Sequence, residues 1–295
     1  MPFQLDGLGG QSWNGTSRAL WARLGGLDPR YPVSFLITLI LVLGEARYGI
    51  LGGYDRLATA LGVCVATELA LSWWLGGGRF ANVASAYITG ISLALLIKPR
   101  ADLLWPFALG GFLAIASKYV LQYRGRHLWN PSNFAISLLV LAAPASVAIL
   151  SHQWGNDLAT NAVIWGFGLL IAARVRMLHV TLTYVACFVA LALMRSAIAG
   201  GPLLAEIAPL TGPMYQLFIF FMITDPKTTV STVRGRVIVA AAVAVAETAI
   251  RLAGDYHVAL LRPLYPAPPI LALAIVGPLA KALDLYREAR SGRRS

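Results

Sequence analysis

Charged residues are scarce in this sequence: Asp, Glu, Lys and Arg make up 13% of the 295 residues, whereas 58% are hydrophobic. The few charges lie between long apolar segments that recur along the whole chain. Such segments are apolar on all sides, which is typical of membrane spans and unlike the one-sided helices of a water-soluble domain. The first segment begins near Pro32, which argues against a signal peptide followed by a soluble body.

Cysteine and histidine are also rare. The two cysteines, Cys64 and Cys187, lie within apolar segments and are too few for a disulfide framework. The chain has no Cys-x-x-Cys motif, and its four histidines share no ligand spacing, so we expect no zinc or iron–sulfur site. It also lacks a phosphate-binding Walker loop and a Gly-rich dinucleotide motif before a strand. No catalytic residue is therefore predicted, and any redox chemistry requires a bound cofactor.

The pattern of apolar segments predicts a polytopic all-α protein with ten transmembrane helices. We expect them at 32–52, 56–76, 83–97, 103–121, 133–150, 158–173, 178–198, 212–224, 236–253 and 267–285. The membrane domain then covers 32–286, in halves 32–150 and 158–286. A cytoplasmic arm, 1–31, precedes it, and a basic tail, 287–295, follows it.

Basic residues are distributed unevenly about these ten segments. The net charge is +11, and with the N-terminus inside the cell, cytoplasmic segments hold 17 of the 24 Lys and Arg residues. This asymmetry predicts that both termini are cytoplasmic and that the basic charge faces anionic lipid. We expect no nucleic-acid partner.

The third segment of each predicted half is short and ends near a proline. The first reads ASAYITGISLALLIKP, residues 84–99, and the second reads GPMYQLFIFFMITDP, residues 212–226. Proline disfavours helical geometry at the preceding residue, so each helix should stop there. Because each half has an odd number of spans, related halves must be inverted. Interrupted helices at matching positions of inverted halves indicate a midplane binding site.

A second break lies in HLWNPSNFAI, residues 127–136. The Asn130–Pro131 pair is a turn signal, and Ser132 or Asn133 can cap the fifth helix. This plain interpretation competes with a functional one, in which the amides of Asn130 and Asn133 bind a polar ring edge. We predict that Asn130 and Asp225 lie close together around a shared cavity.

Several charged residues fall within or beside the spans, where charge is costly and usually meets a partner. Glu247 has Arg251 four residues on, the spacing of a same-face helix pair. Glu68 has no basic residue nearby in sequence and is the candidate for an ion or proton role, the alternative being a protonated or hydrogen-bonded structural acid near Trp73. Lys118 ends the fourth span, and Asp225 begins a polar cluster at the end of the eighth.

The two broken stretches, HLWNPSNFAI and FFMITDPKT, resemble the NqrB/RnfD family. That family contains one membrane subunit of the sodium-pumping NADH:quinone reductase and one of the Rnf complex. The likeness is greatest to its UnbU-type branch. The resemblance implies a urea-transporter-like fold of two inverted five-helix halves, in a bacterial inner membrane. It also implies electron transfer with a flavin, together with other membrane subunits.

The chain departs from this family in one respect. Its relatives attach flavin mononucleotide to a threonine in an S-G-A-T motif between the fifth and sixth spans. The corresponding stretch here, 144–163, lacks that motif, and Thr160 lies in the unrelated LATNA. We therefore expect no covalent flavin. Noncovalent riboflavin, FMN or a quinone is expected instead, bound by residues of the two broken stretches and the fourth span: Lys118, Asn130, Asn133, Thr224, Asp225, Lys227 and Thr228.

Two other functions remain open at the level of sequence. One is a transporter or channel for a small neutral solute, with the third and eighth spans lining its path. The other is a scaffold subunit that has lost its cofactor and anchors a larger membrane complex.

Overall fold

The computed structural model of the chain describes residues 30–291, apart from 77, 124 and 152–156. The predicted arm therefore lies almost wholly outside the described residues, as do the last four residues of the tail. The first helix of the described part begins at Arg30, within the segment that we assigned to the arm. The described residues are mostly helical, and a helix occupies each of the ten predicted apolar segments.

The first five of these segments form α2 (Arg30–Tyr48), α3 (Tyr54–Leu75), α4 (Ala84–Leu96), α5 (Trp105–Val120) and α6 (Pro131–Ala142). As predicted, α4 ends before Pro99, and the chain continues as strand β1 (Ile97–Pro99). A short hairpin of β2 (Gln122–Tyr123) and β3 (Arg126–His127) connects α5 to α6.

The second five segments form α7 (Leu158–Arg174), α8 (Leu178–Ala199), α10 (Pro213–Leu217) with η2 (Phe218–Met222), α11 (Val233–Asp255) and α12 (Pro268–Ser291). Shorter helices lie between them: α9 (Leu203–Ile207), η1 (Ala208–Thr211) and η3 (Ala259–Leu264). The η2 segment is a turn of π-helix, in which Ile223 N donates to Phe218 O at 3.0 Å. The helix ends there, three residues before Asp225, as the following proline led us to expect.

The fifth predicted span is wrong in its second part. We expected one helix over 133–150, but α6 ends at Ala142, and residues 147–149 form strand β4 (Val147–Ile149). Pro144 cannot continue the helix, and the β-branched residues beyond it suit a strand. Strand β4 pairs antiparallel with β1, with Ile97 opposite Ile149. The fold is thus helical with two small sheets and is not purely α.

The burial pattern is that of a membrane protein. Large apolar side chains are exposed on the outer faces of the helices, for example Phe35, Phe112 and Leu193. Within the described residues, five helices are long and apolar enough to cross a bilayer, namely α2, α3, α8, α11 and α12. The segments Leu203–Thr211 and Pro213–Met222 form a sixth if they count as one span bent by 60°. Three of the shorter helices end where the chain turns to strands: α4 before β1, α5 before the β2–β3 hairpin and α6 before β4.

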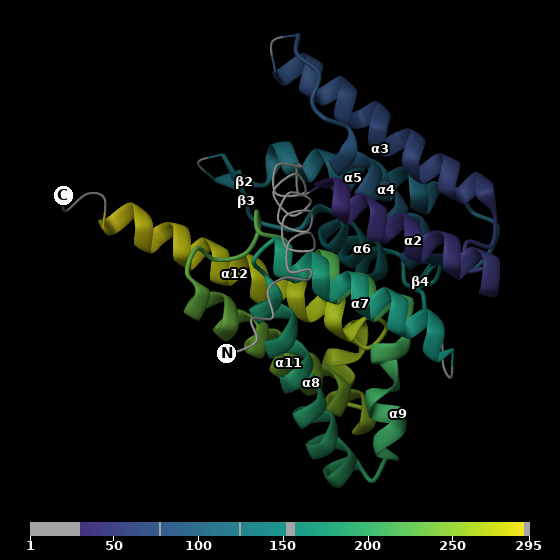
Figure 1. Cartoon of the computed structure of the whole chain (residues 1–295), viewed down its shortest axis with the longest axis vertical. Helices are drawn as coiled ribbons and strands as arrows, with labels where there is room; N and C mark the ends of the chain where they lie inside the picture. The colour runs from purple at the N-terminus through teal and green to yellow at the C-terminus, as the bar shows by residue number, and fades with distance from the viewer. Residues whose placement is uncertain (1–29, 77, 124, 152–156, 292–295) are drawn as a thin grey trace, which may run out of the picture.

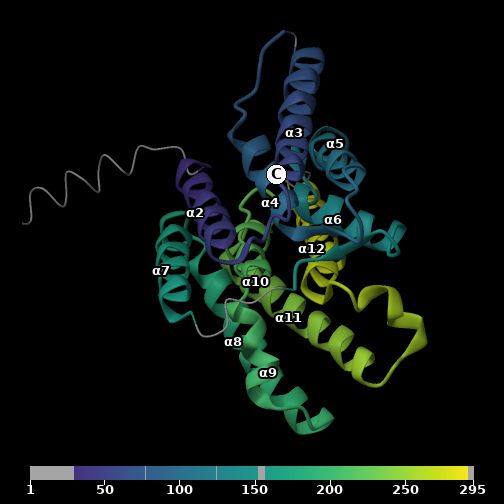
Figure 2. The same ribbon diagram turned by 90° about the vertical axis from the view of Figure 1, so that its right-hand side faces the viewer.

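The helices form two groups, as Figures 1 and 2 show. Helices α3, α4, α5 and α6 lie together in both views, and α8, α9 and α11 lie at the other end of the molecule. Helix α3 packs on α4 and α5, while α8 packs on α11. Helix α2 contacts α7, and α6 of the first group contacts α12, which packs on α11 of the second group. The buried core is continuous across this boundary.

Candidate functional site

The two broken stretches meet in the structure. The Asn130 Nδ2 group donates to Asp225 Oδ2 at 3.2 Å and to Phe221 O at 3.4 Å. These contacts join residues more than 90 positions apart in sequence, at the start of α6 and the end of η2. The predicted proximity of Asn130 and Asp225 is confirmed.

Asn130 also caps helix α6. Its Oδ1 accepts from Asn133 N at 3.1 Å, and its backbone adopts the extended conformation typical of a cap. We had expected Ser132 or Asn133 in this role, which was wrong by two or three residues because Pro131 occupies the first helical position. Both the oxygen and the amino group of the Asn130 side chain are engaged in hydrogen bonds. Asn130 therefore mainly links the two stretches.

A cavity of about 600 Å³ adjoins this junction. Its volume lies within the range of small-molecule and cofactor sites. One side of its wall comes from α4, whose residues Ser85, Ile88, Thr89 and Ser92 recur at helical spacing. The predicted residues Glu68, Lys118, Asn130, Thr224, Asp225 and Lys227 all line it.

Phe220 and Phe221 contribute to the apolar part of the wall, together with Val33, Ile88 and Met222. Phe220 packs edge-on against Trp165 of α7, with ring centroids 5.2 Å apart. This packing depends on Gly168, since a Cβ there would lie 2.4 Å from the Phe220 ring. The cavity thus combines apolar and aromatic residues with hydrogen-bonding groups, as ligand sites do.

Glu68 has an ion-pair partner that the sequence could not show. Lys118 Nζ donates to Glu68 Oε2 at 2.8 Å and to Ser85 Oγ at 3.0 Å. The Tyr119 hydroxyl donates to Glu68 Oε1 at 3.0 Å. Both charged side chains are more than nine-tenths buried, yet both border the cavity. Residues of three helices, α3, α4 and α5, therefore form one polar cluster in its wall.

The Asp225 carboxylate organises the turn after η2. Its Oδ1 accepts from Lys227 N at 3.0 Å, while its backbone carbonyl accepts from Thr228 N and Thr229 N. Lys227 follows in this turn, lines the cavity and is exposed. Among the described residues, the Lys227 ammonium makes no ion pair.

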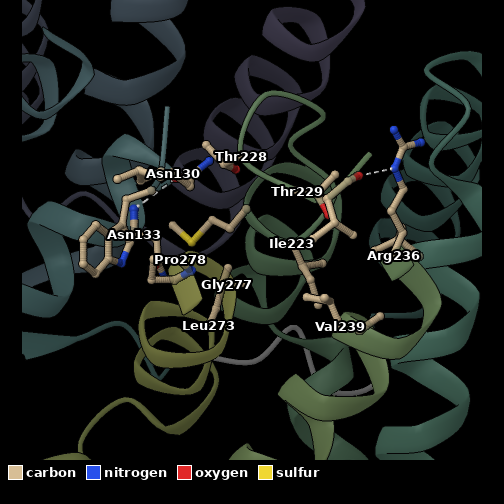
Figure 3. Close-up of a pocket in the computed structure, with 16 residues that line it drawn as sticks. Asn130, Asn133, Ile223, Thr228, Thr229, Arg236, Val239, Leu273, Gly277 and Pro278 are labelled. Atoms are coloured by element: carbon tan, nitrogen blue, oxygen red, sulfur yellow. Dashed lines mark hydrogen bonds between the residues drawn. The ribbon is translucent and has the colours of Figure 1, made fainter. Parts of the chain in front are cut away.

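Two predicted residues lie outside the large cavity. Asn133 and Thr228 line a separate small pocket of about 20 Å³, bounded by Leu273, Gly277 and Pro278 of α12 and by Val239 of α11 (Figure 3). Asn133 Nδ2 donates to Ile270 O at 2.8 Å, whereas its buried Oδ1 has no partner among the described residues. Such a pocket has room for about one water molecule and not for a cofactor.

Sequence reasoning missed other parts of the wall. His127, Asn82 and Gln122 line the cavity, and neither Asn82 nor Gln122 belongs to a recognisable motif. Burial lowers the pKa of His127, and the nearby Lys227 ammonium lowers it further, so its imidazole is neutral at neutral pH. The position of His127 at the start of the HLWNPSNF stretch was the one available signal.

The other intramembrane acid belongs to a closed cluster. Glu247 is fully buried and accepts from Arg251 Nε at 2.9 Å, which confirms the predicted pair. The hydroxyls of Tyr184 and Tyr215 also donate to it. Phe188 packs beside both tyrosines. None of these residues borders the large cavity.

The stretch that carries the flavin-bearing threonine in the resembling family is only partly described, because 152–156 lie outside the described residues. The Thr160 hydroxyl donates to Asp157 Oδ2 at 2.7 Å and is 4% exposed, so it serves the N-terminus of α7. No protein-family model matches the chain, and no characterised protein matches it at a significant level.

Proposed function

We propose that the chain folds as ten membrane-crossing segments in two inverted halves, α2–α6 and α7–α12. Helix pairing within the halves corresponds: α3 packs on α5 as α8 packs on α11, and α5 packs on α6 as α11 packs on α12. Contacts between the halves join counterparts: α2 with α7, α4 with α10 and α6 with α12. Such self-pairing is what a twofold relation between two halves requires.

The polar contacts support this topology. One set joins only segments assigned to the outer side, such as Tyr48 with Asp157 and Arg56 with Asp102. Another set joins only segments assigned to the cytoplasmic side, such as Arg126 with Glu288. The segments of the second set also carry the excess of basic residues. We therefore place both termini in the cytoplasm, with the protein in a bacterial inner membrane.

Within this fold, the chain is a membrane subunit that binds a noncovalent flavin or a quinone for electron transfer, in a complex with other membrane proteins. The observation that carries this proposal is the cavity of about 600 Å³ between the Asn130 turn and the Asp225 turn. Its phenyl rings suit a planar ring system, and its hydroxyl, amide and charged groups suit the polar edge of that ring. The side chains in its wall supply no redox chemistry, so the bound group must carry the electrons.

The purified protein tests this proposal directly. We expect visible flavin absorbance, released by acid, or a quinone extractable by organic solvent. Asp225→Ala opens the junction with Asn130 and should reduce the bound cofactor severalfold, while the protein still inserts in the membrane. Asp284→Ala is the matched control, because Asp284 binds Ser231 on the same face of the molecule, away from the cavity. Equal cofactor content in both variants would remove Asp225 from the site.

A second function, transport of a small neutral solute, is favoured by the position of the cavity beside the broken helix α10–η2. Interrupted helices near the boundary of inverted halves form the substrate sites of many transporters. Solute flux into liposomes containing the protein without a chromophore would support this alternative. Co-purifying subunits, with neither chromophore nor flux, would instead indicate a scaffold.

A further inference from the structure

Helix α7 contains two interior glycines whose surroundings differ. Among the described residues, a Cβ at Gly166 would meet nothing within 4 Å, whereas a Cβ at Gly168 would lie closer than 3.0 Å to three atoms of the Phe220 ring. Carbon atoms in favourable contact are about 3.5–4.0 Å apart, so no side chain fits at position 168 while the ring keeps its place. Glycine is less favourable than alanine inside a helix. The close approach of Phe220 accounts for the glycine at 168.

The backbone on either side of Phe220 is held by other parts of the fold. Phe221 O accepts from Asn130 Nδ2 at 3.4 Å. The Phe218 ring packs against Tyr184 of α8, with ring centroids 5.2 Å apart. A residue inserted next to the Phe220 ring would therefore displace the ring and not the segment that carries it.

The Phe220 ring has an open side only toward the large cavity, which it lines. Trp165 of α7 packs edge-on against the ring, and its Nε1 donates to Leu210 O at 3.3 Å, which fixes the indole. A methyl group at position 168 would thus push the ring by about 1 Å into the cavity.

We propose that Gly168 is a positioning residue that limits the size of the ligand through Phe220. Because position 168 has no side chain, the ring lies against α7 and leaves the adjoining part of the cavity free. The inference rests on the proposed function and deepens it, since it names what sets the width of the same site. A small ligand needs less of this width than a large one and should tolerate a displaced Phe220 ring.

Binding of two probes of different size to the purified full-length protein tests this inference, after removal of any co-purified cofactor. Riboflavin has a fused-ring system and duroquinone a single ring, and both are followed by quenching of tryptophan fluorescence. In Gly168→Ala, riboflavin should bind about tenfold more weakly, the effect of overpacking a site by one methyl group. Binding of duroquinone should change less than about twofold. A variant that was merely destabilised would lose both probes alike.

Gly166→Ala is the matched control, because it adds the same methyl group to the same helix where nothing among the described residues lies within 4 Å. It should leave both affinities unchanged. The double variant Gly168→Ala/Phe220→Leu should bind riboflavin within about threefold of Phe220→Leu alone, since no ring remains to be displaced. Equal effects of the two alanine variants, or a loss that the double variant does not restore, would overturn the inference.

Two further outcomes separate this inference from the proposed function. If the wild type binds duroquinone and not riboflavin, the loss in Gly168→Ala and its rescue must appear with duroquinone, or the inference is overturned while the cofactor cavity stands. If neither probe binds, the proposed function fails, and a structure of Gly168→Ala decides the role of Gly168. A Phe220 ring displaced into the cavity would support that role, and a ring in its wild-type position would overturn it.

Discussion

Two glutamates are buried between packed helices, one between α3 and α5 and the other between α8 and α11, and their surroundings differ. In the first half, Glu68 and Lys118 join α3 to α5 at the wall of the large cavity. In the second half, Glu247 lies between α8 and α11, where Arg251 and two tyrosine hydroxyls surround it. The Glu247 cluster does not border the large cavity, and aromatic rings close it.

The hydrogen-bond partners of a buried charge distinguish a structural role from a functional one. An ionisable residue at membrane depth is by default a candidate for function. At Glu247 all the acceptors meet donors of the protein itself, which is what stable burial requires. At Glu68 the partner is the Lys118 ammonium, which borders the cavity and uses two of its three N–H donors in hydrogen bonds to the described residues. The two clusters therefore predict different responses to the same substitution.

The largest effect is expected at the closed cluster. Glu247→Gln removes the charge that compensates Arg251, whose side chain is only 19% exposed and loses that ionic partner. The free energy of unfolding should fall by about 3–5 kcal/mol, the cost of breaking a buried ion pair. Thermal unfolding of the purified protein in detergent measures this change. A loss below about 1 kcal/mol would show that water compensates the Arg251 charge. The Glu247 cluster would then not be more closed than the Glu68 cluster.

The same substitution at the cavity should have a smaller effect. In Glu68→Gln, the Lys118 ammonium remains next to a cavity that admits water, so hydration replaces part of the lost interaction. The free energy of unfolding should fall by about 1–2 kcal/mol. Thermal unfolding under identical conditions gives the value. If Glu68→Gln destabilises the protein as much as Glu247→Gln, the two clusters have the same structural role.

Low pH should reduce the stability of the folded protein through His127, which lines the cavity. Burial, and then the Lys227 ammonium, lower the pKa of His127 below its usual value of 6.5 in the folded protein. The unfolded chain therefore takes up the proton at a higher pH than the folded protein does. Folding stability contributed by neutral His127 is complete above pH 6.5 and is lost as the pH falls below it.

The melting temperature should thus fall as the pH is lowered from about 6.5 to about 5.5, and it should fall less in His127→Gln. Melting curves of both proteins across this range provide the test. An identical pH dependence in the two would mean that His127 is solvated in the folded protein.

The smallest effect is expected at the surface. Arg126 and Glu288 form a pair 3.1 Å apart whose side chains are 49% and 40% exposed. Arg126→Ala should change the free energy of unfolding by less than about 1 kcal/mol, because water and salt screen such pairs. Chemical or thermal unfolding at low and high salt measures it. A larger loss would show that the β2–β3 hairpin is held to α12 mainly by this contact.

Much of the fold was accessible from the sequence because its causes are local. Apolar runs predicted the helical segments, and the prolines at 99 and 226 predicted where two of them stop. The error in the fifth span was also local: a short apolar run past Pro144 does not distinguish a helix from a strand. Strand β4 exists because β1 offers it a partner, and that partner lies in a distant part of the sequence.

The candidate site was accessible only in part. The residues around Asn130 and Asp225 were identified from the two breaks, and the structure brings them to one cavity. Asn133 and Thr228 belong to the small pocket instead, because α6 and the Asp225 turn direct these side chains toward α11 and α12. The role of Lys118 as the partner of Glu68 had no sequence signal, since the two lie 50 positions apart.

The sequence by itself determined that the chain is a helical membrane protein with two polar interruptions, because a long apolar run and a proline act on their own backbone wherever they stand. Only the tertiary structure decided which buried acid is sealed and which borders a cavity. That outcome depends on which helix faces meet, and the packing energies that select those faces are sums over residues far apart in the chain.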